Sequence, residues 1–290
     1  MNSAVNDNHS TPTPPPAAVE AWSGKNRGDE NFPVGSLLIA KNLRPHVHAY
    51  YNFARNADDI ADSDQLAPDE KIARLNVMEA VLLGESDAAS PAAAALKTSL
   101  GLSGVPAIHA RELLVAFRQD AQKTRYENWA ELMDYCRYSA APVGRYVLDL
   151  HGEDRGTWPA SDALCASLQV LNHLQDCAAD LRSLDRCYLP QDWLHKNEAS
   201  TDDLARPKAS PGVRAVLDEM LAATEVLNAR AAALPGLVKS RRLRMETAVI
   251  AALARRLTAR LQKNDPLAMR VKLTKLDFLL AVMGALPRLA

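Results

Sequence analysis

The sequence is poor in the residues that build turn-rich β-structure and aromatic binding surfaces. It has only 12 glycines, and Phe, Trp and Tyr together make up 5% of its 290 residues. So few glycines argue against a β-sandwich, because the many tight turns of that fold use glycine. So few aromatics leave a core built mostly from Ala, Leu, Val and Ile. The hydrophobic fraction of 48% and the charged fraction of 24% are typical of a globular protein.

The chain also lacks an excess charge of either sign, since 34 Lys and Arg residues are matched by 35 Asp and Glu residues. A general attraction for nucleic acid is therefore not expected. No apolar run reaches the roughly 18 residues needed to cross a bilayer, and the start of the chain has no apolar stretch typical of a secretory leader. The four cysteines form no C-x-x-C pair, so we expect buried, reduced thiols in a cytoplasmic protein.

Composition divides the chain into two parts. Residues 1–20 are polar and proline-rich, and we predict a disordered tail because such a segment buries too little apolar surface to offset its ordering entropy. Residues 21–290 show no repeat and no linker, and we predict one all-α domain. The alternation typical of strands is nearly absent. Proline, Asn and acidic residues at helix starts predict helices over 43–63, 68–84, from 106, from 128, and over 159–184, 211–234, 238–263 and 270–286.

The first unusual pattern is a row of acidic residues on the helix expected at 43–63. At about 100° per residue, Tyr51, Arg55, Asp58, Asp59 and Asp62 fall in one stripe. Like charges at this spacing cost a helix about 0.2–0.5 kcal/mol per pair, and a divalent cation would remove that repulsion. Carboxylate oxygens spaced in this way suit Mg²⁺. The alternative to a metal site is an acidic helix face exposed to solvent. Without further evidence, this alternative would be the preferred interpretation of the row.

A second acidic row changes this balance. Gln169, Asn172, Asp176 and Asp180 share one face of the helix expected at 159–184, and apolar neighbours indicate that this helix is buried. Acids on a buried helix are costly unless they are paired or metal-bound. Helix bundles build metal sites from side chains of facing helices, so the two rows predict a magnesium site across a cavity.

Together with these rows, segments 58–62, 135–144 and 169–190 resemble the squalene/phytoene synthase family, in order and from about residue 30 to 288. Within that family, segments 30–34 and 43–46 are similar to the bacterial hydroxysqualene synthases of hopanoid biosynthesis. The resemblance implies a single all-helical isoprenoid synthase domain with a central hydrophobic cavity. It also implies Mg²⁺ ions that bind the substrate diphosphate and are held by Asp58, Asp59, Asp62, Asp176 and Asp180.

The same match implies roles for further side chains. The substrate-binding residues would be Arg55, Gln169, Asn172 and Arg186, and the catalytic tyrosines lining the reaction centre would be Tyr51 and Tyr135. His173 is expected to pack in the core. Relatives often carry Arg and an acid where this chain has Gln175 and Ala179, which leaves one positive contact and one carboxylate fewer. This departure is compatible with a site that holds one substrate diphosphate.

The implied activity is Mg²⁺-dependent conversion of presqualene diphosphate to hydroxysqualene by ionisation, carbocation rearrangement and capture by water. Two alternatives stay open: head-to-head prenyl transfer that makes presqualene diphosphate or phytoene, and a non-catalytic interaction protein that kept the fold. The expected partner is a prenyl diphosphate. Peripheral contact with the inner membrane, without a spanning segment, and association with other squalene-pathway enzymes complete the expectations.

Overall fold

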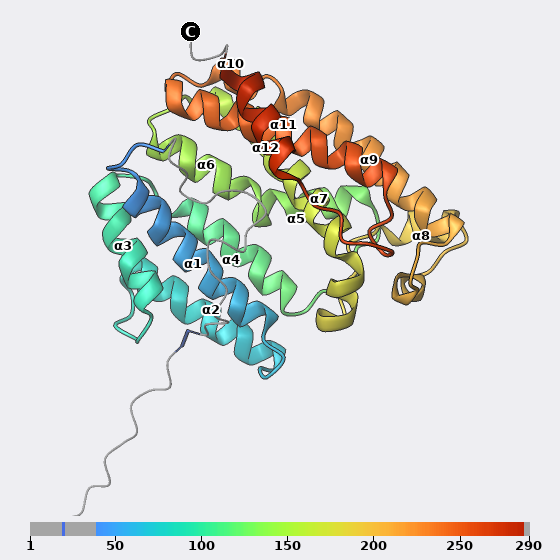
Figure 1. Ribbon diagram of the computed structural model, residues 1–290. Coiled ribbons are helices and arrows are strands. Elements are labelled where there is room, and N and C mark those ends of the chain that lie inside the picture. Colours follow the sequence, from blue (N-terminus) through green and yellow to red (C-terminus); the bar gives the residue numbers. More distant parts are fainter. Residues whose placement is uncertain (1–18, 21–38, 287–290) are drawn as a thin grey trace, which may run out of the picture.

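The structure is a computed structural model that describes residues 19–20 and 39–286, and within these ranges it is all-α, which confirms the predicted class (Figure 1). The ranges contain no β-strand, although Arg125 and Cys187 form an isolated parallel bridge. The helices are α1 (Arg44–Asp62), α2 (Pro68–Leu83), α3 (Pro91–Ser103), α4 (Ile108–Asp120), α5 (Trp129–Ser139), α6 (Ala141–Leu150), α7 (Trp158–Leu184), α8 (Gln191–Lys196), α9 (Pro211–Ala231), α10 (Leu234–Leu237), α11 (Arg241–Lys263) and α12 (Lys275–Ala285), with 3₁₀ turns at Arg155–Thr157 and Thr201–Ala205.

Local signals explain most helix boundaries. The Asn128 side chain accepts a hydrogen bond from the Glu131 amide at 3.0 Å and so caps α5 as predicted. Gly84 ends α2 in the left-handed region, with φ of 79°. The helix expected from residue 270 instead begins at Lys275, because Thr274 and Asp277 form a capping box there. The sequence reading did not anticipate α3, α8 or α10.

The helices form two packed groups that meet at α6. Helices α1 to α4 surround one apolar core, and α5, α7, α9 and α11 surround a larger one; Figure 1 shows the first group in blue to green and the second mostly in yellow to red. The α6 residue Tyr146 stacks on Tyr50 of α1 with ring centroids 3.9 Å apart. This aromatic contact holds α1 next to the second group.

An apolar cavity of about 240 Å³ lies where the two groups meet. Five helices contribute to its walls, and the lining residues include Val47 from α1, Val147 from α6, Leu168 from α7, Leu234 from α10 and Ile250 from α11. The cavity therefore lies at the N-terminal end of the same two helices, α1 and α7, that carry the acidic rows further along.

Some sequence predictions fall on residues that the structure does not describe. The predicted tail, residues 1–20, lies outside the described residues except for Val19 and Glu20. Glu20 accepts hydrogen bonds from the Ser90 hydroxyl at 2.7 Å and the Ala92 amide at 2.6 Å. It thereby provides an acceptor for a backbone amide in the first turn of α3. Segment 30–34, which contributed to the family resemblance, also lies outside. The four cysteines are free thiols, and three of them are buried.

None of the described helices is both long enough and apolar enough to traverse a bilayer.

Candidate active site

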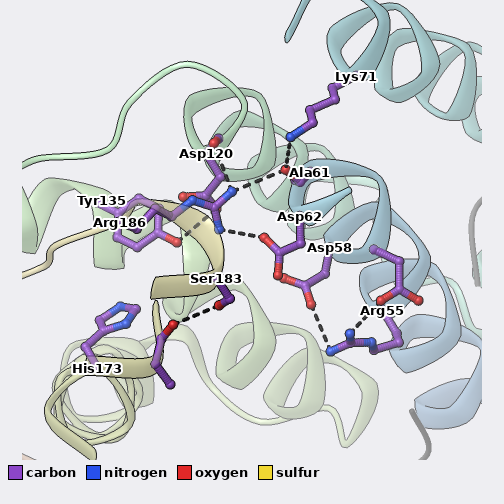
Figure 2. A network of polar contacts seen from close by, with 12 residues as sticks. Arg55, Asp58, Ala61, Asp62, Lys71, Asp120, Tyr135, His173, Ser183 and Arg186 are labelled. Atoms are coloured by element: carbon purple, nitrogen blue, oxygen red, sulfur yellow. Dashed lines mark hydrogen bonds and ion pairs between the residues drawn. The ribbon is translucent and has the colours of Figure 1, made fainter. Parts of the chain in front are cut away.

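The acidic row of α1 occupies the last two turns of that helix and is organised by Arg55 (Figure 2). The guanidinium of Arg55 pairs with Asp58 at 2.8 Å and with Asp59 at 2.5 Å. The Asp59 side chain is only 4% exposed, whereas that of Asp58 is 33% exposed. One cation is thus shared by two carboxylates, which leaves the row with a net negative charge.

A second arginine reaches the row from the segment that follows α7. Helix α7 ends at Asp185, which takes the left-handed conformation with φ of 51°. The chain then lies against residues 124–127, because the Cys187 amide donates to the Thr124 carbonyl at 2.9 Å and the Gln191 amide donates to the Tyr126 carbonyl at 2.9 Å. These bonds fix residues 186–190 beside the ends of α1 and α4.

Arg186 joins the C-terminal end of α7 to the acidic row of α1. Its backbone amide donates to the Asp180 carbonyl at 3.3 Å, and its guanidinium pairs with Asp62 at 2.5 Å. The guanidinium also donates to the carbonyls of Ala61, at 3.2 Å, and Asp120, at 2.9 Å. Figure 2 shows this side chain pointing from the α7 side toward α1. The sequence match predicted that Arg186 contacts the diphosphate; in the structure its guanidinium pairs with Asp62.

The cluster around these arginines contains more carboxylates than cations. Burial, and then repulsion from Asp62, raise the pKa of Asp58 to about 8, although Arg55 opposes the shift. Burial also raises the pKa of Asp120 to about 7, against the lowering effect of Arg186. The acidic side chains are Asp58, Asp59, Asp62 and Asp120, and the basic ones are Arg55, Lys71 and Arg186.

A divalent cation fits this donor set. Carboxyl groups whose pKa is raised toward neutral pH, first by burial and then by neighbouring carboxylates, are groups that a cation would stabilise in the ionised form. Oxygen ligands of this kind suit Mg²⁺. In the described part of the chain, no three His, Cys, Asp or Glu side chains already stand close enough together to hold an ion. The carboxylates of α1 instead pair with Arg55 and Arg186, so ion binding would require a rearrangement of these pairs.

The row on α7 is half-buried. Asn172, Asp176 and Asp180 follow one another at intervals of four residues on this helix. Asp180 is close enough to Tyr188 to contribute to the raised pKa of that phenol, after the larger effects of burial and Asp120. The adjacent Gln175 side chain donates a hydrogen bond to the Val271 carbonyl at 2.6 Å, in the segment before α12.

An aromatic cluster lies beside the acids. The His173 ring stacks on Tyr188 at 3.5 Å, and the Tyr135 ring lies 5.8 Å from Tyr188. The Tyr135 hydroxyl donates to the Asp120 carboxylate at 3.0 Å. Burial, and then Arg186, lower the pKa of His173 to about 3, so this imidazole stays neutral at physiological pH. A neutral ring can stack on the phenol without bringing another positive charge beside Arg186.

The other predicted residues lie along α1 and α7. Gln169 approaches His173, with 3.2 Å between their Nε2 atoms, and Tyr51 is half-buried one turn before Arg55 on α1. The structure directly joins Arg55 to Asp58 and Asp59, Arg186 to Asp62, and Tyr135 to Asp120.

Sequence reasoning missed three contributors to the site. Asp120 follows the buried residues Leu113 and Phe117 on one face of α4, so an acid on an apolar stripe could have revealed it. Lys71, whose ammonium donates to the Ala61 carbonyl at 2.9 Å, carried no sequence signal. Tyr188 belonged to a recognised motif but was not assigned a role. His173 is buried, as expected for core packing, but it packs within the site.

The all-α fold, with one acidic row on α1, another on α7 and an apolar cavity lined by the same two helices, is that of an isoprenoid synthase domain. The family model for squalene/phytoene synthase matches residues 25–277, and the chain belongs to this family.

Comparison with individual proteins narrows the resemblance. The chain is 47% identical to hydroxysqualene synthase of Rhodopseudomonas palustris over 270 residues, covering 93% of this chain and 92% of the relative. It is 45% identical to hydroxysqualene synthase of Zymomonas mobilis over 275 residues, covering 94% and 92%. Among solved structures, a squalene synthase from Alicyclobacillus acidocaldarius has 34% identity and a TM-score of 0.70, covering 79% of this chain and 87% of that chain. A dehydrosqualene synthase shares the fold, with a TM-score of 0.77 at 21% identity and coverage of 90% and 92%.

Proposed function

We propose that the protein catalyses the Mg²⁺-dependent conversion of presqualene diphosphate to hydroxysqualene. The observation that carries this proposal is the 45–48% identity to hydroxysqualene synthases over about nine-tenths of the chain. The acidic rows and the apolar cavity provide the two environments that such a substrate needs. A diphosphate needs cations, and a hydrocarbon needs apolar walls.

The spacing of these environments suits a diphosphate joined to a long hydrocarbon. On α1, Val47 lines the cavity and Asp58 lies eleven residues later, which corresponds to about 16 Å along the helix axis. On α7, Leu168 lines the cavity and Asp176 lies eight residues later, or about 12 Å. A diphosphate held between the rows would therefore have its hydrocarbon directed toward the cavity.

The residues that would hold Mg²⁺ are Asp58, Asp59 and Asp62 on α1, and Asp176 and Asp180 on α7. When bound, the ion supplies positive charge that stabilises the leaving diphosphate as the carbon–oxygen bond breaks. The protein's own cations support this site: Arg55 carries a positive charge beside Asp58, and Arg186 orients Asp62.

The remaining residues protect and direct the carbocation. The aliphatic cavity excludes water until rearrangement is complete, which prevents early capture. We assign Tyr51 and Tyr135 to the reaction centre, where their ring faces can stabilise positive charge. Gln169 and Asn172 supply polar groups on the face of α7 that leads to Asp176. Asp120 accepts the Tyr135 hydroxyl hydrogen bond and thereby fixes the orientation of that ring.

The deciding experiment supplies purified protein with Mg²⁺ and presqualene diphosphate, without NADPH, and identifies the product by mass spectrometry. We expect hydroxysqualene. Absence of hydroxysqualene together with turnover of farnesyl diphosphate would instead establish head-to-head prenyl transfer.

A matched pair of variants tests the assignment of the metal ligands. Asp176→Asn should reduce turnover strongly, whereas Asp202→Asn, an exposed position in the 3₁₀ turn Thr201–Ala205, should leave it unchanged. Equal turnover in both variants would remove Asp176 from the mechanism.

A further inference from the structure

Helix α12 is packed with most of its large apolar side chains facing outward, although Phe278 packs against the core. The residues that it buries are Asp277, Ala281 and Ala285, which are small or charged. After Lys275, its exposed side chains are large and apolar: Leu276, Leu279, Val282, Met283 and, at its C-terminal cap, Leu286. The hydrophobic effect favours the opposite arrangement when water is the only surrounding medium.

These exposed residues form a continuous stripe. Leu276 is 61% exposed, Leu279 is 54%, Met283 is 50% and Leu286 is 49%. At about 100° per residue, they and Val282 fall within roughly one third of the helix circumference. Single exposed apolar residues are normal on a protein surface, but a contiguous group marks an interaction site. We call this stripe, together with residues 269–275 before it, the α12 patch.

The charges of the α12 patch have one sign. Arg270, Lys272 and Lys275 are exposed at its N-terminal end. The only acid between residues 269 and 286 is Asp277, which is buried and lies 2.7 Å from the guanidinium of Arg260. The exposed ionisable groups of the α12 patch are therefore all basic, which is the complement of an anionic lipid surface.

A groove beside the stripe also suits an anionic lipid. It has a volume of about 330 Å³ and lies between α11 and α12. Its walls combine small apolar residues with two guanidinium groups, the lining being Ala248, Ala252, Arg255, Arg256, Ala259, Leu280 and Gly284. Apolar walls next to guanidinium groups suit the junction between a lipid phosphate and its acyl chains.

The α12 patch is connected to the candidate active site. The Gln175 side chain, which precedes Asp176 on α7, donates a hydrogen bond to the Val271 carbonyl at 2.6 Å. The segment leading into α12 is thereby fixed against the helix that carries the second acidic row. A membrane bound at the α12 patch would lie close to the element that receives the diphosphate.

We propose that the α12 patch docks the protein peripherally on an anionic phospholipid surface, with the apolar stripe among the acyl chains and the basic residues at the headgroups. The choice of lipid over a protein partner rests partly on the proposed function, since a substrate with such long hydrocarbon chains would be supplied from a membrane. The docking itself requires no catalytic step.

Sedimentation with vesicles tests this proposal on the full chain. The protein should pellet with phosphatidylcholine vesicles that contain phosphatidylglycerol, and far less with phosphatidylcholine alone. Lys272→Ala and Lys275→Ala should each weaken partitioning by about fivefold. The double variant L279S/M283S should weaken it by more than about tenfold. Leu102→Ser is the matched control, because Leu102 is 78% exposed on α3, away from the α12 patch.

Three outcomes would overturn the proposal: no pelleting of the wild type, equal pelleting of L279S/M283S and wild type, or a dimer in lipid-free sedimentation velocity that L279S/M283S abolishes without any vesicle binding. In detergent micelles, L279S/M283S should turn over presqualene diphosphate at the wild-type rate. Absence of hydroxysqualene in micelles with intact vesicle binding would refute the proposed function and leave the docking surface standing.

Discussion

Magnesium binding should depend steeply on pH because the ion and protons compete for Asp58. The pKa of this carboxyl is raised from 3.8 to about 8 by burial and by Asp62. Between these two values the folded, metal-free protein holds a proton that the unfolded chain releases. The contribution of Asp58 to stability therefore falls as pH rises from about 4 to about 8. Mg²⁺ binds the ionised form, so its stabilising effect should grow over the same range.

The size of the effect follows from the protonated fraction of Asp58. With a pKa of about 8, proton competition weakens the apparent affinity for Mg²⁺ by about 100-fold at pH 6, about elevenfold at pH 7 and about twofold at pH 8. The dissociation constant should thus improve by roughly fiftyfold between pH 6 and pH 8. Near pH 6, each bound ion should release about one proton from Asp58.

Isothermal titration calorimetry with MgCl₂ at constant ionic strength measures both quantities, since buffers of different ionisation enthalpy report the proton release. Asp58→Asn should bind Mg²⁺ more weakly and lose most of the pH dependence. An affinity that stays constant from pH 6 to pH 8 in the wild type, with no proton release, would refute the assignment of Asp58 as a ligand.

Three substitutions test the framework of the site. Arg186→Met leaves Asp62 without its ion-pair partner and removes a positive charge near the Asp120 carboxyl group, and should lower the free energy of unfolding by about 3–5 kcal/mol at pH 7; urea denaturation at pH 5, below the Asp120 pKa of about 7, should show a smaller loss. Tyr135→Phe removes the 3.0 Å hydrogen bond to Asp120. The free energy of unfolding from urea denaturation at pH 7 should fall by about 1.5–3 kcal/mol, and an unchanged value would contradict a hydrogen bond to a buried carboxylate. Gly144→Ala would place a Cβ atom against the Ser161 hydroxyl oxygen of α7, and overpacking between α6 and α7 should cost about 1–3 kcal/mol, visible as a lower melting temperature.

The acidic rows show which parts of the site could be predicted from local sequence. Residues three and four apart on a helix share a face whatever the helix packs against. Asp58 and Asp62 could therefore be placed together before any fold was known, and so could Asp176 and Asp180. The absence of strand patterns similarly indicated an all-α domain, and the ordered motifs indicated the family.

The contacts between these rows depend on segments far apart in the chain. Arg186 pairs with Asp62 across 124 positions, and Tyr135 reaches Asp120 at the end of a different helix. Burial and neighbouring charges determine a pKa, so the raised pKa values of Asp58 and Asp120 could be found only once these segments were in place.

Helix α12 likewise shows what the sequence could not predict and the tertiary structure decided. Its sequence is apolar on nearly every face, and periodicity alone could not tell which side would be buried. Packing on α11 decided this, because Ala281 and Ala285 allow a close approach and Asp277 meets Arg260. The chain itself determined that helices with acidic rows would form. Only the tertiary structure determined which charges meet and which apolar surface faces outward, because both depend on neighbours that are distant in sequence.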